Sequence, residues 1–269
     1  MQIKPRKSLG QNFLVDKNIQ RKIIATCAFT ASDTVVEIGA GTGIMTQLLA
    51  AVTGELHAFE IDRRLKSVLS DMFKGNRHVH IHDKDILTAD IAGECGLAGE
   101  RKVKVFGNIP YYITTPIIEH LFAAREHISV IFITVQKEFA ERITAEAGTK
   151  LFGSFSCFVR YFTLPRIVMM IPKGCFNPRP KVDSCLLRLE VRSEPPVQVK
   201  DEALMFNIIR TSFQQRRKTL RNSLQDTVKE SSLAEFFLRC RIDRNTRPER
   251  LSLEDFARLA DCLTEMERP

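Results

Sequence analysis

Short apolar runs alternate with amphipathic stretches through the first half of the chain. The runs are rich in β-branched residues and predict buried strands at 34–38, 55–60, 79–82, 102–106 and 128–135. Helical spacing between them predicts helices at 44–51 and 63–73. Strands that alternate with helices are typical of a parallel sheet covered by helices. The pattern therefore predicts an α/β domain with a doubly wound, Rossmann-like sheet.

Two further extended runs, at 166–171 and 184–190, are separated by a loop rich in proline and glycine. Two strands joined by such a loop predict a hairpin that ends the sheet. Pro195-Pro196 then interrupts the pattern. We therefore expect the sheet domain to span residues 1–194.

The remaining residues, 195–269, show only helical periodicity. The apolar spacing predicts helices at 203–210, 217–224, 233–239 and 253–265. Ser252 precedes the last of these, and Asp255 stands where the third helical residue would lie, which is a typical N-cap arrangement. We expect a small, all-helical C-terminal domain.

The composition is that of an ordinary globular protein, with 44% hydrophobic and 27% charged residues. No run approaches the roughly 18 apolar residues of a membrane span, and no apolar block follows the basic first residues. We therefore expect neither a membrane segment nor a signal peptide. The seven cysteines are odd in number, scattered and without a C-x-x-C pair, which predicts reduced thiols and a cytoplasmic location.

Positive charge is concentrated in two places. The chain carries 40 Lys and Arg against 32 Asp and Glu, a formal net charge of +8. One cluster lies within residues 1–22, and the other comprises Arg216, Arg217, Lys218 and Arg221. Such clusters favour an acidic partner such as nucleic acid, although a solvated protein face gives the same pattern.

A glycine-rich turn follows the first predicted strand, with the sequence Gly39-Ala-Gly41-Thr-Gly43 before a helix. Glycines at such a junction let the backbone approach a ligand, and the helix start offers free amides. The spacing is G-x-G-x-G and not the G-x-G-x-x-G of dinucleotide-binding proteins, which argues against a nicotinamide-dependent oxidoreductase. Glu60 ends the next predicted strand, and Asp85 follows the one after it. Ligands of parallel sheets bind at such strand ends, where Glu60 can accept hydrogen bonds from a ribose.

The fourth predicted strand ends in Gly107-Asn108-Ile-Pro110-Tyr111. The Asn108 side chain and a carbonyl next to the proline offer two acceptors on a stiff turn. Together they can hold both hydrogens of an exocyclic amino group while the tyrosine stacks on the attached ring. This segment indicates a site for an amino-bearing base.

His78, His80 and His82 alternate along the third predicted strand and therefore share one face. A metal site needs further ligands in a closing geometry, and the sequence shows none. We therefore expect no metal.

In combination, these motifs resemble the KsgA/Dim family of small-subunit rRNA adenine dimethyltransferases. The likeness runs nearly from end to end. Further matching stretches are Lys7–Leu14, Gln136–Arg142, Phe176–Ser184, Phe213–Asn222 and Pro248–Phe256. The resemblance implies S-adenosylmethionine as the cofactor and a Rossmann-like catalytic domain followed by a helical rRNA-binding domain.

The resemblance also implies roles for individual residues. Gly39 and Gly41 would line the methionine end of the cofactor, and Asp85 would bind its adenine. The full set of implied cofactor positions is Asn12, Leu14, Gly39, Gly41, Glu60, Ile61, Asp85, Ile86 and Asn108. The implied catalytic positions, which would hold the target adenine, are Asn108, Pro110, Tyr111 and Phe176. The expected RNA contacts are Lys7, Arg179, Lys181, Arg216, Arg217, Lys218 and Arg221.

The implied activity is dimethylation at N6 of two adjacent adenosines in the 3′-terminal hairpin loop of 16S rRNA, with a part in small-subunit biogenesis. The expected partner is the small-subunit rRNA or the immature 30S particle, and we expect a monomer. Two alternatives remain open. One is the related methyltransferase type that acts on 23S rRNA and confers antibiotic resistance. The other is a non-catalytic RNA-binding or assembly factor on the same fold.

Overall fold

A computed structural model describes residues 6, 10–214, 218–225 and 230–266 of the chain, with the backbone alone for 230–232. The chain divides into two compact units. The first comprises residues 1–140 and 165–191, and the second residues 141–164 and 192–269. Every helix in the described ranges is too short or too polar to span a bilayer.

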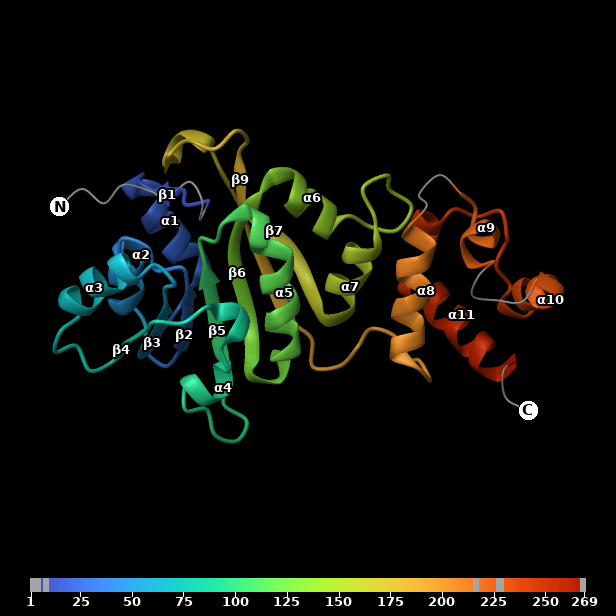
Figure 1. Cartoon of the computed structure of the whole chain (residues 1–269), viewed down its shortest axis with the longest axis horizontal. Coiled ribbons are helices and arrows are strands. Elements are labelled where there is room, and N and C mark those ends of the chain that lie inside the picture. Colours follow the sequence, from blue (N-terminus) through green and yellow to red (C-terminus); the bar gives the residue numbers. More distant parts are fainter. Residues whose placement is uncertain (1–5, 7–9, 215–217, 226–229, 267–269) are drawn as a thin grey trace. The chain divides into compact units, whose positions relative to one another are not determined.

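The first unit is built on a sheet of seven strands, counted over the described residues and ordered β4-β3-β2-β5-β6-β9-β7 (Figure 1). Its strands are β2 (Thr34–Ile38), β3 (Glu55–Phe59), β4 (Val79–His82), β5 (Val103–Gly107), β6 (Ile128–Gln136), β7 (Thr163–Ile171) and β9 (Ser184–Val191). The first five in spatial order run parallel, and β9 pairs with β6 antiparallel. The predicted fold class and the closing hairpin are confirmed.

Helices cover both faces of this sheet. Helices α1 (Lys17–Cys27), α2 (Ile44–Ala50) and α3 (Arg63–Met72) pack on one face, where alternate strand residues such as Leu56 join them in the core. On the other face lie α4 (Ile91–Glu94) and α5 (Thr114–Ala123), the latter drawn to the right of β6 in Figure 1. The parallel strands therefore end at one edge with helix starts and loops gathered around them.

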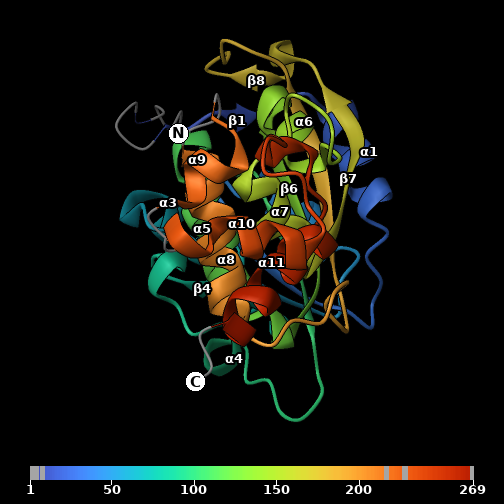
Figure 2. The same ribbon diagram turned by 90° about the vertical axis from the view of Figure 1, so that its right-hand side faces the viewer.

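The N-terminal segment returns to this edge. Strands β1 (Phe13–Leu14) and β8 (Phe176–Asn177), both labelled in Figure 2, pair antiparallel. In this pairing Leu14 lies opposite Phe176. The sequence pattern predicted neither of these two-residue strands. Because they pair with each other, residues 12–14 are held at the carboxyl edge of the main sheet.

The second unit is helical. It contains the second half of α6 (Lys137–Thr144), together with α7 (Ser154–Phe162), α8 (Glu202–Gln214), α9 (Leu220–Leu224), α10 (Glu230–Cys240) and α11 (Leu253–Met266). Its C-terminal part begins at Arg192, close to the expected boundary at 194/195, but it also takes in residues 141–164, which we expected in the sheet domain. These residues group here because Phe158 and Tyr161 of α7 pack edge-on against Phe206 of α8.

The start of α11 has the predicted cap. The Ser252 hydroxyl accepts from the Asp255 backbone N–H at 3.2 Å, and the Asp255 carboxylate accepts from the Ser252 N–H at 3.0 Å. The two residues thus satisfy each other's backbone donors at the helix end.

Candidate active site

A cleft lies at the carboxyl edge of β2, β3, β4 and β5, with an open volume of about 1160 Å³ that includes solvent-filled space at its mouth. The structure brings all nine implied cofactor residues to its wall. They are Asn12, Leu14, Gly39, Gly41, Glu60, Ile61, Asp85, Ile86 and Asn108. They come from five separate segments of the chain, so the fold and not the local sequence assembles the site.

The floor of the cleft is the glycine turn held by Glu60. The Glu60 carboxylate accepts from the Gly41 N–H at 2.8 Å and from the Asp62 N–H at 2.8 Å. Gly41 has a φ of 58°, and a Cβ there would lie 3.2 Å from the Phe13 ring, so both conformation and space favour glycine. Glu60 is buried, and burial raises its pKa. Each carboxylate oxygen still has lone-pair capacity for a ligand hydroxyl.

Asp85 stands at the end of the third parallel strand of this edge. Its Oδ1 accepts from the Leu87 N–H at 3.0 Å and caps the short 3-10 helix Ile86–Thr88. Its Oδ2 receives no hydrogen bond from any residue within the described ranges. The side chain is therefore oriented by one oxygen and presents the other to the cleft as an acceptor.

Glu37 is a site residue that the sequence reasoning did not assign. It lines the cleft from the end of β2 with 1% of its surface exposed, and its Oε2 is buried without a hydrogen-bond partner among the described residues. Burial, with a smaller contribution from the charge of Glu60, raises the pKa of Glu37 to about 8. A cationic ligand at this wall would lower that pKa and favour the ionised carboxylate.

Asn108 is held from two sides. Its Nδ2 donates to the Asn12 carbonyl at 3.1 Å, and its Oδ1 accepts from the Thr134 hydroxyl at 2.5 Å. Thr134 lies within β6 and is completely buried. The amide is thus fixed in one orientation, and Oδ1 keeps one lone pair for a ligand. The sequence did not point to Thr134, because a threonine inside an apolar strand has the pattern of an ordinary core residue.

The other implied catalytic residues are not all on the cleft wall. Pro110 lines it, and so does Tyr112, whose side chain is 64% exposed. The Tyr111 hydroxyl lies 2.6 Å from the Ser184 Oγ, and its ring is not part of the wall. Phe176 is 4% exposed and packs in the core cluster that includes Leu14. The roles implied for Tyr111 and Phe176 stay predictions.

The expected RNA-binding cations fall into three groups. Arg179 and Lys181 are exposed in the loop between β8 and β9, and Lys218 is exposed in the second unit. Arg221 is half-buried in α9. Lys7, Arg216 and Arg217 lie outside the described residues.

Comparison with known proteins finds relatives that are similar over nearly the whole chain. The chain is 43% identical over 267 residues to ribosomal RNA small subunit methyltransferase A of Moorella thermoacetica, covering 96% of this chain and 92% of that protein. It is 40% identical over 263 residues to the protein of the same name from Clostridium botulinum, covering 97% and 95%.

Two solved structures share the fold. The 23S rRNA methyltransferase ErmE is 24% identical with a TM-score of 0.72, covering 94% of this chain and 100% of that one. A dimethyladenosine transferase from Plasmodium falciparum is also 24% identical, with a TM-score of 0.74 and coverage of 92% and 95%. Residues 2–265 match the family model described as ribosomal RNA adenine dimethylase. With its cleft residues, its relatives and this nearly complete match, the chain belongs to the ribosomal RNA adenine dimethylase family.

Proposed function

We propose that the protein is an S-adenosylmethionine-dependent rRNA adenine N6,N6-dimethyltransferase that acts on small-subunit rRNA. We further propose that its targets are two adjacent adenosines in the 3′-terminal hairpin loop of 16S rRNA. The observation that carries this proposal is the fixed amide of Asn108 on the wall of a cleft that also holds Gly41, Glu60 and Asp85.

The wall of the cleft has the chemistry that the cofactor requires. Glu60 offers acceptors for ribose hydroxyls, and the Asp85 Oδ2 offers one for the amino group of adenine. Glu37 supplies a buried carboxyl for the cationic end of the molecule, and the cleft wall around it includes Gly39 and Gly41. When bound, S-adenosylmethionine supplies an electrophilic methyl group on a sulfonium.

The chain's part in the reaction is to position an amine. The N6 lone pair of adenine is delocalised into its ring, so the nitrogen is a poor nucleophile. The Asn108 Oδ1 and the carbonyl of Ile109 or Pro110 would accept the two N6 hydrogens, aim the nitrogen and stabilise positive charge that grows on it. Alignment of this kind contributes about 7–11 kcal/mol in well-oriented intramolecular reactions. This displacement needs no metal.

The substrate enters as an unstacked base. Both faces of the adenine must be reached, and a hairpin loop gives up a base at lower cost than a duplex. The basic residues Arg179 and Lys181 would contact the RNA backbone. An immature 30S particle as the natural substrate, a monomeric enzyme and a cytoplasmic setting complete the proposal. All seven cysteines are free thiols in the structure.

The test is methyl transfer from labelled S-adenosylmethionine to purified small and large ribosomal subunits that lack these modifications. Nucleoside mass spectrometry then identifies the product. We expect N6,N6-dimethyladenosine in small-subunit RNA alone. Label in the large subunit would instead assign the chain to the 23S-modifying type. No label in either subunit, with cofactor still bound, would favour a non-catalytic assembly factor.

The Asn108→Ala variant tests the proposed role of Asn108 in catalysis. We expect it to reduce turnover by at least about a hundredfold, because it removes an acceptor for the N6 hydrogens. The cofactor Kd, measured by calorimetry, should change much less. Turnover equal to that of the unmodified protein would contradict the role of Asn108.

A further inference from the structure

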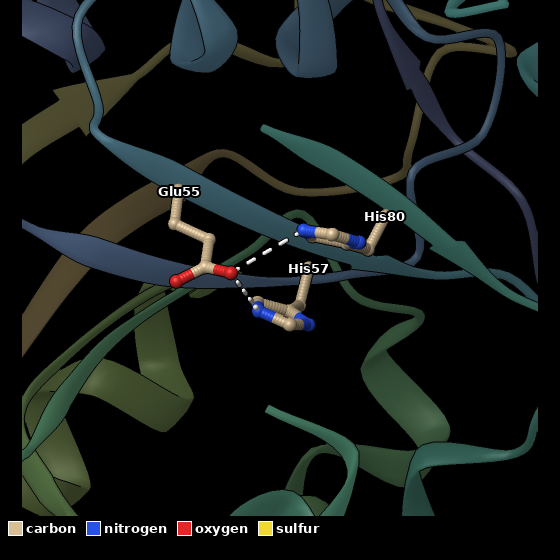
Figure 3. Close-up of side chains that lie close together, drawn as sticks. All are labelled: Glu55, His57 and His80. Carbon is tan, nitrogen blue, oxygen red and sulfur yellow. Dashed lines mark ion pairs between the residues drawn. The ribbon is translucent and has the colours of Figure 1, made fainter. Parts of the chain in front are cut away.

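Three side chains meet at the opposite end of β3 and β4 from the cleft. Glu55 and His57 come from β3 and His80 from β4, and all three point to the same face of the sheet (Figure 3). The Glu55 Oε1 lies 3.5 Å from the His57 Nε2 and 3.3 Å from the His80 Nε2. One ligand atom from each residue lies within 4.8 Å of the other two.

Neighbouring groups determine where the proton of His57 resides. The His82 Nδ1 lies 3.2 Å from the Glu94 Oε2, and a hydrogen bond from Lys84 holds the pKa of Glu94 below its usual range. An ionised carboxylate only accepts, so the His82 Nδ1 carries the proton and the His82 Nε2 carries a lone pair. That lone pair faces the His57 Nδ1 at 3.1 Å, so His57 donates there.

When its Nδ1 donates to His82, the neutral His57 ring carries a lone pair on Nε2. This atom is buried without a hydrogen-bond partner among the described residues, and the His57 side chain is 4% exposed. A buried imidazole nitrogen without a hydrogen bond therefore lies 3.5 Å from a carboxylate oxygen, an arrangement that a bound cation would stabilise.

We infer that Glu55, His57 and His80 form a binding site for a zinc-like divalent transition-metal ion, separate from the methyl-transfer cleft. Two imidazoles and one carboxylate are typical zinc ligands, whereas magnesium and calcium prefer oxygen atoms. Bonds of about 2.0–2.1 Å in a tetrahedron separate ligand atoms by about 3.4 Å. The two distances to Glu55 already match this spacing. Because 42% of the His80 side chain is exposed, water can reach the fourth position.

The surroundings support the site in the way that metal centres are commonly supported. A histidine ligand usually donates its second ring nitrogen to a partner that fixes its tautomer. Here the His57 Nδ1 does so toward His82, which in turn is fixed by Glu94. The rings of His57 and His80 are stacked with centroids 4.7 Å apart, so packing restricts the planes of both rings. The ion would join β4, an edge strand, to β3.

The sequence alone predicted no such site because it showed only the alternation of His78, His80 and His82. The missing ligands come from another strand. In the parallel register of β3 and β4, His57 lies opposite His80, and Glu55 lies two residues earlier on the same face. That register brings ligands from two separate segments of the chain to adjacent points of the sheet.

The experiment is a zinc titration of the full, tag-free, metal-free protein against a chromophoric chelator. We expect one Zn²⁺ per chain and a rise in the melting temperature, with no competition from excess Mg²⁺. His80→Ala should weaken the Kd by more than about 100-fold, and Glu94→Gln by about 10–100-fold as a supporting residue. His127→Ala is the matched control, since His127 pairs with Glu126 in a separate 3-10 helix and should leave the Kd unchanged.

Two further measurements show whether the variant folds and which type of ligand binds the metal. The far-UV spectrum and melting temperature of the metal-free His80→Ala variant show whether it folds, and its partly exposed position favours that. Co²⁺ in place of Zn²⁺ distinguishes the ligand type, because thiolate ligands give a charge-transfer band that imidazole and carboxylate do not. Failure to bind Zn²⁺ would overturn the inference. A thiolate band, or unchanged affinity in folded His80→Ala, would also overturn it.

Discussion

The Thr134 hydroxyl donates a hydrogen bond to the Asn108 Oδ1, with 2.5 Å between the two oxygen atoms. We expect Thr134→Val to lower kcat by roughly 2–10-fold, which is the rate equivalent of one hydrogen bond worth about 0.5–1.5 kcal/mol. The cofactor Kd and the RNA KM should change little, since the residue is completely buried behind the amide. Thr134→Ser, which keeps the hydroxyl, should restore most of kcat. A serine variant as slow as the valine variant would show that packing alone matters at this position.

Glu37 makes stability depend on pH. Its folded pKa of about 8 lies above the ordinary value of 4.5, so between these two values the folded chain binds more protons than the unfolded chain. The free energy of unfolding should therefore fall as pH rises from about 4.5 to 8, by an amount on the order of several kcal/mol. Glu37→Gln should reduce this slope, as measured by urea unfolding across the pH range. Parallel curves for the two proteins would contradict an uncharged Glu37 in the fold.

At the scale of single residues, the sequence was sufficient to predict site residues that stand at the end of a strand. Glu60 and Asp85 are such residues, because periodicity shows where each strand stops and parallel strands stop at one edge. Thr134 could not be found this way. Its contact with Asn108 depends on the β5–β6 register, in which Gly107 lies opposite Ile133. The side on which the Tyr111 ring lies likewise depends on Ser184, 73 residues further along.

Among the elements, α11 offers the clearest local test. Its reciprocal cap joins Ser252 and Asp255, and loss of an N-cap side chain costs about 1 kcal/mol. We expect Ser252→Ala to lower the free energy of unfolding of the second unit by about this amount, measured as a shift of the urea midpoint at constant slope. Ser252→Thr is the control, because threonine keeps the capping hydroxyl. Equal midpoints for the alanine variant and the unmodified chain would show that the cap contributes nothing.

The sequence predicted strands and helices with strong periodicity and missed those that tertiary contacts define. Helix α1 has a mixed polar and apolar sequence in a basic region, and its start at Asp16, which accepts from the Asn18 and Ile19 N–H groups, was not identified. Strands β1 and β8 have only two residues each, too few for any pattern. Residues 141–164 were assigned to the sheet domain because aromatic packing between α7 and α8 leaves no mark in local periodicity.

At the scale of the whole molecule, net positive charge should make RNA binding depend on salt. Removing one cation that neutralises a phosphate reduces the slope of log K against log salt by about 0.7–0.9. We therefore expect the double variant Arg179→Ala, Lys181→Ala to reduce this slope by about twice that amount. The matched control replaces Lys74 and Arg77 with alanine, since both precede the amino end of β4. Equal slopes for the two double variants would remove Arg179 and Lys181 from the RNA interface.

The pairing of β1 with β8 has a consequence for how two ligands affect each other. Asn12 and Leu14 belong to the cofactor side of the cleft, while Phe176, opposite Leu14 in this ribbon, belongs to the segment implied to receive the target base. A ligand that orders one strand therefore orders the other. The factor by which cofactor tightens RNA binding must equal the factor by which RNA tightens cofactor binding. We therefore expect each ligand to tighten the binding of the other, whichever of them binds first.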